Sequence, residues 1–563
     1  MHTSYLEWLQ HPLLDTETRD ELKSLIDKQE IEDRFYCHLS FGTAGIRGML
    51  GAGTNRMNKY TIRRTTTGFA QYLQKMDPNV KTKGIAIAYD SRHQSPFFAH
   101  TAAEVLAYHG IRVFLFSELQ PTPLLSYAVR QLNAAGGIVI TASHNPPEYN
   151  GFKVYGPDGA QLLPASAQAI LSEINLIEDM ISLPVLPFTE GLEQGLIQFI
   201  SPTIEEQYMK QLENLSLRKD RIYAMRNTFK IVFTPLHGTG NKPVQKILSR
   251  IGFQHVYVVE EQAHPDPDFP TVKTPNPEDP AAFAHALQLA QKQKADIVIS
   301  TDPDADRLGA LIRHQNQYIP LTGNQIGVLL LYYILEQKQQ QKTLSQNATI
   351  LKSIVTTDFT EKIASHYGAK TVNLLTGFKY IAERIAHFEK SDAETFLMGF
   401  EESYGYLLGD FVRDKDAVQA AMLICEMAAY YQYQSQTLID VLEHLYQQFG
   451  YYQETLISYT FKGKEGLERI NQIMIQLREH PPKQIAAMKV TQIEDYQAGL
   501  HDLPTANVLK AYLEDGSWIA IRPSGTEPKI KFYIATVAPT MKTSRDKITS
   551  MRQFIQDRIG AEK

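Results

Sequence analysis

Near the middle of the chain, the sequence places three aspartates at alternating positions, Asp302, Asp304 and Asp306. The preceding residues, 295–300, read Ala-Asp-Ile-Val-Ile-Ser and predict a buried strand. Carboxylates this close repel one another unless a cation lies among them, and hard Mg²⁺ or Ca²⁺ suits oxygen ligands best. An EF-hand loop is excluded, because Arg307 stands where such a loop requires glycine. The pattern therefore predicts a divalent-metal site, with a solvated acidic turn as the alternative.

A second loop after a predicted strand carries a serine that could act as a nucleophile. Ser143 follows the apolar run 137–140, lies beside His144, and precedes an Asn-Pro pair that predicts a turn. We expect this serine to be exposed and next to a proton carrier, as a nucleophile requires. The Gly-x-Ser-x-Gly pattern of serine hydrolases is absent. With a metal loop in the same chain, the favoured electrophile is phosphorus, because Mg²⁺ shields phosphoryl oxygens.

A third loop, at 522–528, reads Arg-Pro-Ser-Gly-Thr-Glu-Pro and lies between two predicted strands. Arg522 offers a planar fork for two hydrogen bonds to a phosphate, and Ser524 and Thr526 add hydroxyl donors. Gly525 would let backbone N–H groups approach an anion closely. The segment predicts a phosphate-binding loop, with a plain tight turn as the alternative.

The segments that must position these loops follow one plan three times. Each has a strand, a helix that ends at a glycine, and a second strand; the glycines are Gly110, Gly252 and Gly368. A further strand in each segment ends in a polar loop, at 141–146, 302–307 and 399–405. Such units build mostly parallel sheets covered by helices, and ligands gather at the carboxyl ends of the strands. We expect three similar α/β domains whose loops meet in one cleft, followed from about residue 449 by a smaller α+β domain.

Composition excludes several classes of function. The 563 residues carry a net charge of −6, so no overall field favours nucleic acid or an anionic membrane. The longest apolar run, 326–335, is too short to span a membrane, and the N-terminal residues lack an apolar signal core. The two cysteines, Cys37 and Cys425, are too few for a disulfide framework. Walker and dinucleotide motifs are also absent. We expect a cytoplasmic protein that binds a small molecule and needs no obligate protein partner.

Five motifs in order resemble one known family. They are 41–48 (Phe-Gly-Thr-Ala-Gly-Ile-Arg-Gly), 141–146, 302–307, 399–405 and 522–528. On these motifs the chain is similar to the α-D-phosphohexomutase superfamily and, within it, to the phosphoglucomutases. The resemblance implies an α/β fold of four domains around a central cleft, three similar mixed α/β repeats and a smaller C-terminal α+β domain. The implied boundaries are 1–205 for the phosphoserine domain, 206–322 for the metal domain, 323–445 for the sugar domain and 446–563 for the phosphate domain.

The same resemblance assigns roles to individual residues. Ser143 would be the phosphoserine, and one of its phosphate oxygens would complete an Mg²⁺ site with Asp302, Asp304 and Asp306. The residues implied around the reacting phosphate are Arg47, His144, Lys153 and Arg307, with His144 or Lys153 moving protons. The residues implied for the sugar are Thr376, Gly377, Glu401, Ser403 and Lys415. Those implied for the non-reacting phosphate are Arg522, Ser524, Gly525 and Thr526.

The implied reaction interconverts α-D-glucose 1-phosphate and glucose 6-phosphate. Phosphoserine would give its phosphoryl group to the sugar, and glucose 1,6-bisphosphate, as intermediate and activator, would turn over before returning a phosphate. The Asp-Pro-Asp-Ala-Asp form of the metal loop and Glu402 look closer to the branch that holds phosphoglucomutases and phosphopentomutases. Phosphopentomutase, phosphomannomutase, a hexose bisphosphate synthase and a non-catalytic sugar-phosphate sensor stay open as alternatives.

Overall fold

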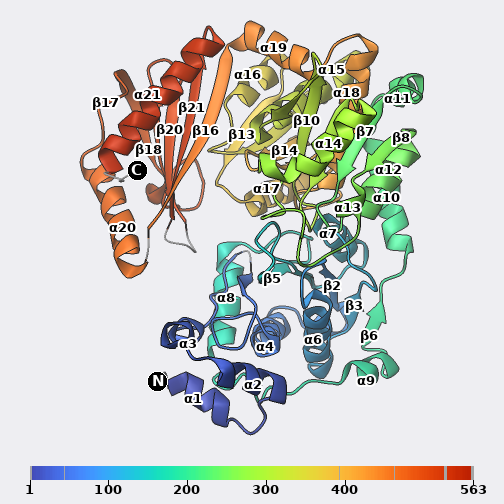
Figure 1. Cartoon of the computed structure of the whole chain (residues 1–563), viewed down its shortest axis with the longest axis vertical. Coiled ribbons are helices and arrows are strands. Elements are labelled where there is room, and N and C mark those ends of the chain that lie inside the picture. Colours follow the sequence, from blue (N-terminus) through green and yellow to red (C-terminus); the bar gives the residue numbers. More distant parts are fainter. Residues whose placement is uncertain (1–2, 44, 392, 462, 525–528, 560–563) are drawn as a thin grey trace. The chain divides into compact units, whose positions relative to one another are not determined.

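The computed structural model describes residues 3–43, 45–391, 393–461, 463–524 and 529–559, and Figure 1 traces them. The chain forms two compact units. The first comprises Met1–Gly323 and Phe378–Ser435, and the second comprises Asn324–Gly377 and Gln436–Lys563. Within the described residues, no helix is both long and apolar enough to cross a membrane.

The first unit begins with three short helices that pack around a small apolar cluster, which includes Trp8 and Phe35 from the helices and Tyr60 and Ile181 from later segments. These helices are α1 (Thr3–Gln10), α2 (Thr16–Ser24) and α3 (Lys28–Phe35). A six-stranded sheet follows, with the order β1-β5-β4-β2-β3-β6. Its strands are β1 (Ile46–Met49), β2 (Ile85–Tyr89), β3 (Val113–Leu115), β4 (Gly136–Ile140), β5 (Tyr149–Tyr155) and β6 (Ile197–Phe199).

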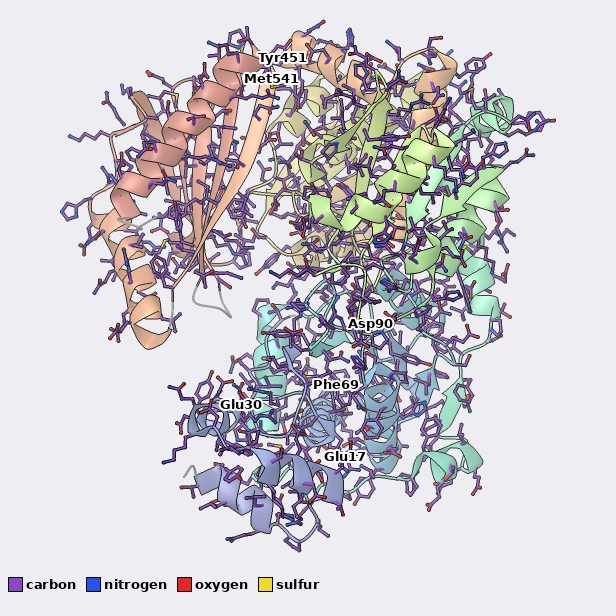
Figure 2. The ribbon with its side chains drawn as sticks, in the orientation of Figure 1. Glu17, Glu30, Phe69, Asp90, Tyr451 and Met541 are labelled. Carbon is purple, nitrogen blue, oxygen red and sulfur yellow. The ribbon has the colours of Figure 1, made fainter. Side chains whose placement is uncertain are left out.

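In this first sheet, β2 pairs parallel with β3 and β4, and β5 pairs antiparallel with β1 and β4. All residues of β2 and β4 are buried, as expected for central strands covered on both faces. The helices of this region are α4 (Lys59–Met76), α5 (Val80–Lys83), α6 (Ser95–Tyr108), α7 (Thr122–Gln131), α8 (Pro164–Asn175) and α9 (Phe188–Glu193). Phe69 of α4 lies in the apolar core beside this sheet (Figure 2).

The second sheet of the first unit has the order β11-β10-β9-β7-β8. Its strands are β7 (Lys230–Thr234), β8 (His255–Val258), β9 (Ile297–Thr301), β10 (Leu308–His314) and β11 (Gln317–Leu321). The fully buried β9 pairs parallel with β7 and antiparallel with β10, and it ends directly before Asp302. The helices here are α10 (Thr203–Leu215), α11 (Lys219–Met225), α12 (Asn241–Ile251), α13 (Glu260–Ala263), η1 (Pro280–Phe283) and α14 (Ala284–Gln293).

The elements of the third repeat belong to both units. In the first unit, β14 (Thr395–Glu401) pairs antiparallel with β15 (Gly405–Leu407), and α17 (Phe378–Ser391) and α18 (Ala417–Tyr433) accompany them. In the second unit, β12 (Ala348–Ser353) pairs parallel with β13 (Lys370–Leu374). The helices around β12 and β13 are α15 (Gly323–Gln340), α16 (Phe359–His366) and α19 (Leu438–Phe449). The predicted helix-ending glycines, Gly110, Gly252 and Gly368, all have a positive φ.

The second unit ends in a sheet of different construction, with the order β16-β21-β20-β19-β18-β17 and antiparallel pairing throughout. The strands are β16 (Tyr451–Thr460), β17 (Gln484–Ile485), β18 (Met488–Asp495), β19 (Leu509–Leu513), β20 (Trp518–Pro523) and β21 (Lys529–Ala538). The helices are α20 (Gly463–Glu479), η2 (Tyr496–Ala498) and α21 (Met541–Ile559), and α21 runs along the sheet (Figure 1). This is the α+β domain predicted from the sequence.

Candidate active site

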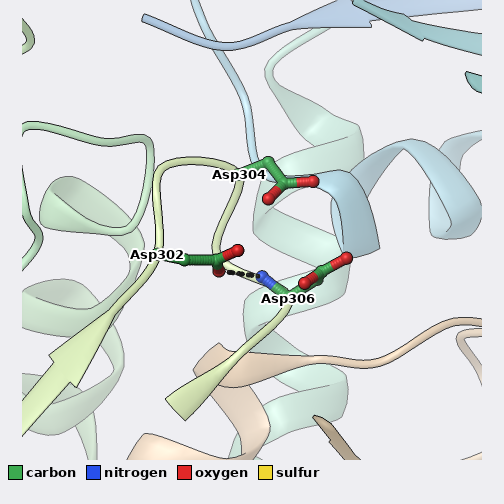
Figure 3. A group of neighbouring side chains, drawn as sticks. All are labelled: Asp302, Asp304 and Asp306. Carbon is green, nitrogen blue, oxygen red and sulfur yellow. Dashed lines mark hydrogen bonds between the residues drawn. The ribbon is translucent and has the colours of Figure 1, made fainter. Parts of the chain in front are cut away.

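The three aspartates predicted as metal ligands lie together in the loop between β9 and β10 (Figure 3). Asp302, Asp304 and Asp306 are at most 2% exposed, and one oxygen of each lies within 4.8 Å of the others. The loop turns sharply at Ala305, whose φ is 52°. The backbone N–H groups of Asp306 and Arg307 both donate to Asp302 Oδ1 at 3.0 Å, which fixes that carboxylate. The turn therefore aims three carboxylates at one small space.

The chemistry of these carboxylates fits a hard divalent cation. Asp304 Oδ1 and Asp306 Oδ1 are buried and accept no hydrogen bond from any described residue. Burial and the two neighbouring negative charges raise the pKa of Asp302 well above its usual value. A cation would remove that repulsion and supply the missing partner of both oxygens.

The predicted nucleophile meets this loop from the first sheet. Ser143 Oγ donates to Asp302 Oδ2 at 2.8 Å and lies 3.2 Å from His144 Nδ1. Burial, together with the positive charges of Arg307 and Arg47, lowers the pKa of His144 well below its usual value. His144 is therefore neutral near pH 7 and able to accept a proton. The expectation that Ser143 is exposed was wrong: it is 4% exposed, because its side chain faces the metal loop instead of solvent.

Two buried lysines form ion pairs with aspartates of this loop. Lys153 Nζ, on β5, lies 2.6 Å from Asp304 Oδ2 and 3.4 Å from Asp306 Oδ2. Lys415 Nζ lies 3.2 Å from Asp306 Oδ2 and 3.1 Å from Asp414 Oδ1. Burial opposes the charge of each lysine, but the adjacent carboxylates outweigh it and raise the pKa of both. Both lysines are therefore protonated and can donate hydrogen bonds to phosphoryl oxygens.

Two arginines and the third polar loop complete this part of the site. Arg307 pairs with Glu278, and Arg47 on β1 donates from Nη1 to Asn145 Oδ1 at 2.9 Å. Glu401, at the end of β14, is 6% exposed, and its negative charge is one of those that raise the pKa of Arg307. Ser403 is half-buried in the turn between β14 and β15. Loops from all three repeats thus contribute to the first unit's polar cluster.

The remaining predicted site residues belong to the second unit. Thr376 and Gly377 follow β13 in the sequence and are half-buried, and Gly377 has a φ of 121°. Arg522 lies near the end of β20, and the N–H of Ser524 donates to the carbonyl of Lys529 at 2.7 Å, which starts the β20–β21 hairpin. The predicted phosphate ligands Gly525 and Thr526 lie outside the described residues.

Sequence reasoning missed a residue that holds the nucleophile's loop. Arg92 Nη1 donates to the carbonyls of Pro146 (2.8 Å) and Tyr149 (3.0 Å), and Nη2 donates to the carbonyls of Ser143 (2.6 Å) and Asn145. Arg92 is 1% exposed and lies beside the buried carboxylate of Asp90, which Figure 2 labels. Its position in a polar loop directly after β2, like the other site loops, is the signal that could have found it.

Thr122 was also missed. It is the first residue of α7, its N–H donates to the carbonyl of Asp304 at 2.9 Å, and its hydroxyl donates to Asp304 Oδ2 at 2.8 Å. These two bonds join the first sheet's α7 to the metal loop. The sequence holds no signal for this contact, since a threonine at a helix start is common.

Repeated α/β sheets, a serine at a cluster of buried carboxylates and surrounding cations define a multidomain α/β enzyme of phosphoryl transfer. Four family models match in order: Phosphoglucomutase/phosphomannomutase, alpha/beta/alpha domain I at 38–180, domain II at 206–315, domain III at 322–449 and the C-terminal domain at 474–538. The chain belongs to the phosphoglucomutase/phosphomannomutase family. The predictions of this family, of its four-domain fold and of an isomerase that transfers phosphoryl groups are confirmed.

Individual relatives agree with this assignment. The chain is 41% identical over 534 residues to a phosphoglucomutase of Staphylococcus aureus (strain bovine RF122 / ET3-1), covering 93% of this chain and 94% of that protein. The phosphoglucomutase of strain USA300 is 40% identical over 538 residues, with the same coverage. The solved structure of pp63/parafusin, a phosphoglucomutase from Paramecium, shares the fold with a TM-score of 0.71 at 18% identity, covering 94% of this chain and 97% of that one. A phosphomannomutase-like structure from Thermus thermophilus gives a TM-score of 0.69 at 21% identity, covering 92% of this chain and 99% of that one.

Proposed function

We propose that this enzyme is a phosphoglucomutase that interconverts α-D-glucose 1-phosphate and glucose 6-phosphate through a phosphoserine at Ser143 and glucose 1,6-bisphosphate. The observation that carries the proposal is the 2.8 Å contact between Ser143 Oγ and Asp302 Oδ2, within a cluster of three buried carboxylates. Support comes from the phosphoglucomutases that are 40–41% identical over 93% of the chain.

Asp302, Asp304 and Asp306 would hold Mg²⁺, together with a phosphate oxygen on Ser143. When bound, Mg²⁺ neutralises phosphoryl oxygens and makes the phosphorus open to attack. The N-acetylphosphoglucosamine mutase of Aspergillus fumigatus, of the same fold, has been solved with GlcNAc-6P and magnesium. The two unpartnered oxygens of Asp304 and Asp306 support the same ion here.

The side chains around Ser143 would move a proton and hold the reacting phosphate. When Ser143 takes a phosphoryl group from the bisphosphate, its Oγ–phosphorus bond forms and the bond from phosphorus to the sugar oxygen breaks. The neutral His144 takes the hydroxyl proton from Ser143 and passes it to the leaving sugar oxygen. When phosphoserine donates its group, the attacking sugar hydroxyl gives its proton to His144, which passes it to Ser143 Oγ as the Oγ–phosphorus bond breaks. Arg47, Arg307 and Lys153 would hold the reacting phosphate by charge-assisted hydrogen bonds.

The outer residues would bind the rest of the substrate. The proposed sugar ligands are Thr376, Gly377, Glu401, Ser403 and Lys415, and the proposed ligands of the non-reacting phosphate are Arg522, Ser524, Gly525 and Thr526. We assign these groups to four proposed domains, 1–205, 206–322, 323–445 and 446–563. We further propose a cytoplasmic enzyme, in keeping with the free cysteines Cys37 and Cys425.

A panel of sugar 1-phosphates tests this function: glucose, mannose, glucosamine, ribose and deoxyribose, each with trace sugar bisphosphate and no acyl-phosphate donor. Glucose 1-phosphate should turn over fastest, and peptide mapping should find phosphate on Ser143. Ser143→Ala should abolish turnover, while the matched change Ser172→Ala at an exposed site should not. A higher rate with ribose 1-phosphate would assign a phosphopentomutase, and a requirement for a donor would assign a bisphosphate synthase. Full activity of Ser143→Ala would overturn the phosphoserine.

A further inference from the structure

The C-terminal domain contains a cavity that takes no part in the proposed reaction. The cavity has a volume of about 470 Å³ and lies between α20, α21 and one face of the sheet. Most of its walls are apolar: Ile473 and Leu477 from α20, Phe554 and Ile555 from α21, and Ile493, Leu509, Ala511, Ile519, Ile521 and Phe532 from the sheet. A volume of this size is within the range of small-molecule sites, roughly 300–1,000 Å³.

A single small residue explains why the sheet side is hollow. Ala511 on β19 lies opposite Ile493 on β18 and opposite Ile519 on β20. Side chains at alternating positions of a strand share a face, so Leu509 and Ile521 flank the same wall. A methyl group therefore stands where its four neighbours are large, and no described side chain of α20 or α21 fills the gap. Water would find few hydrogen-bond partners against these walls, so an apolar occupant fits the cavity better than water does.

The rim of the cavity is polar and carries charge. Arg558, near the end of α21, is exposed, and its guanidinium carbon lies 5.1 Å from the ring centroid of Phe554, a wall residue. This stacking places a permanent positive charge at the mouth of the cavity. Gln476 and His480 add hydrogen-bonding groups, and Glu479 adds a negative charge at the same rim.

We infer that this cavity binds an amphiphilic anion, a molecule with an apolar aliphatic or aromatic body and one acidic group. The body would fill the space above Ala511, and the acidic group would pair with Arg558. Ile521 immediately precedes Arg522, so the occupant would lie against the strand that leads into the predicted phosphate loop. The inference needs only the C-terminal domain's own packing and does not depend on the proposed activity.

A fluorescence titration of the full-length enzyme tests the site with two probes that share an apolar body. One is 8-anilino-1-naphthalenesulfonate, an anion, and the other is N-phenyl-1-naphthylamine, its uncharged counterpart. Each should bind saturably with one molecule per chain. Ala511→Leu fills the hollow and should weaken both probes by about tenfold or more. Arg558→Gln should weaken only the sulfonate, by about two- to fivefold, as expected for an exposed ion pair.

Matched variants make the result decisive. Ala498→Leu adds the same side chain at an exposed position outside the cavity, and Glu479→Gln removes the opposite charge at the rim. The first should leave both probes unaffected, and the second should not weaken the sulfonate. Ile493→Trp, at the partly exposed edge of the wall, provides a second blocking change if Ala511→Leu lowers the melting temperature. The inference would be overturned if both probes still bound with unchanged affinity after Ala511→Leu and Ile493→Trp. It would also be overturned if Arg558→Gln left the affinity for the sulfonate unchanged.

Discussion

The proposed nucleophile, Ser143, is held in a backbone conformation that serine seldom adopts. Ser143 has a φ of 53°, a left-handed value that costs a residue other than glycine about 1–3 kcal/mol. The loop keeps this conformation because the Ser143 N–H donates to Thr141 Oγ1 at 2.8 Å and Arg92 binds four carbonyls around it. Local strain is thus offset by a buried guanidinium that reaches the loop from another strand.

Arg92→Lys should lower kcat about 10²-fold, because an ammonium cannot bind carbonyls in four directions and small misplacements of a nucleophile are expensive. KM should change much less, since Arg92 is not expected to touch the sugar. The measurement is kcat and KM together with the rate of Ser143 phosphorylation by sugar bisphosphate. Arg112→Lys, at an exposed position, is the control. A lowered melting temperature with unchanged kcat would reduce Arg92 to a structural role.

Asp304→Asn should weaken Mg²⁺ binding and lower kcat by about 10²–10³-fold, because a charge that stabilises the transferring group is lost. Mg²⁺ binding to the enzyme, measured by calorimetry, gives a readout independent of activity. Chelation should abolish turnover of the unmodified enzyme, and added Mg²⁺ should restore it. As a control, Asp502→Asn changes an exposed aspartate outside the proposed metal site, and this variant should behave as the unmodified enzyme. Full activity in excess chelator would contradict the metal site.

At the level of elements, the candidate active site forms where the ends of strands and the first residue of a helix, from different repeats, lie together. The fully buried strands β4 and β9 deliver Ser143 and Asp302, which lie 159 positions apart in sequence. The first residue of α7 then binds the carbonyl and the carboxylate of Asp304. Each contact joins two repeats, so the geometry of the site depends on how the sheets of the first unit pack.

In the second unit, β16 carries Glu454, a half-buried residue whose Oε1 is buried and whose protonation should affect stability. Burial raises the pKa of Glu454 from 4.5 to about 7, against hydrogen bonds from Thr357 and Asn324 that lower it. The folded state therefore binds a proton that the unfolded chain has already released between pH 4.5 and 7. Stability should fall as pH rises through this window, by about 3 kcal/mol at most.

Glu454→Gln, which cannot ionise, should remove this loss. The melting temperature of the unmodified protein relative to the variant should decrease as pH rises from 4.5 to 7 and stay constant above that range. Thermal unfolding at several pH values measures the difference, and the exposed Glu479→Gln serves as control. A pH-independent difference would show that folding does not raise the pKa of Glu454.

At the scale of the whole molecule, the predicted substrate ligands are divided between the two units. The first unit holds Ser143 and the aspartates of the loop 302–307, and the second holds Arg522 and Ser524. The proposed turnover of the bisphosphate requires the proposed phosphate ligands, Arg522 and Ser524, to bind either phosphate in the same way. This favours a loop that recognises the phosphate group and ignores the carbon to which it is attached.

Arg522→Ala should mainly raise KM for the monophosphate. A bidentate charge-assisted contact contributes about 1.5–3 kcal/mol, which corresponds to about 10- to 150-fold in kcat/KM. Steady-state kinetics with glucose 1-phosphate measures the effect, and Arg545→Ala on the exposed face of α21 is the control. Unchanged kinetics would place the phosphate loop elsewhere in the chain.

The sequence by itself determined much of this protein. Apolar runs predicted β2, β4 and β9, because buried parallel strands need continuous apolar side chains. Glycines marked the helix ends, since few other residues adopt a positive φ there. The sequence also predicted that Asp302, Asp304 and Asp306 could hold a metal and that Ser143 could act as a nucleophile, because these predictions depend on residue types at short spacing. Each of these features depends on residues close together in the sequence, so it can be predicted without knowing the tertiary structure.

Only the tertiary structure decided which of these groups meet. Arg92 donates to backbone carbonyls, which every residue has. The residue types of the loop 143–149 therefore give no sign that Arg92 binds there. The contact of Lys415 with Asp306 and the burial of Ser143 join segments more than 100 residues apart. The sequence also did not predict that the third repeat is divided between the two units. The packing of helices and strands depends on contacts between residues far apart in the chain, and no short stretch of sequence encodes those contacts.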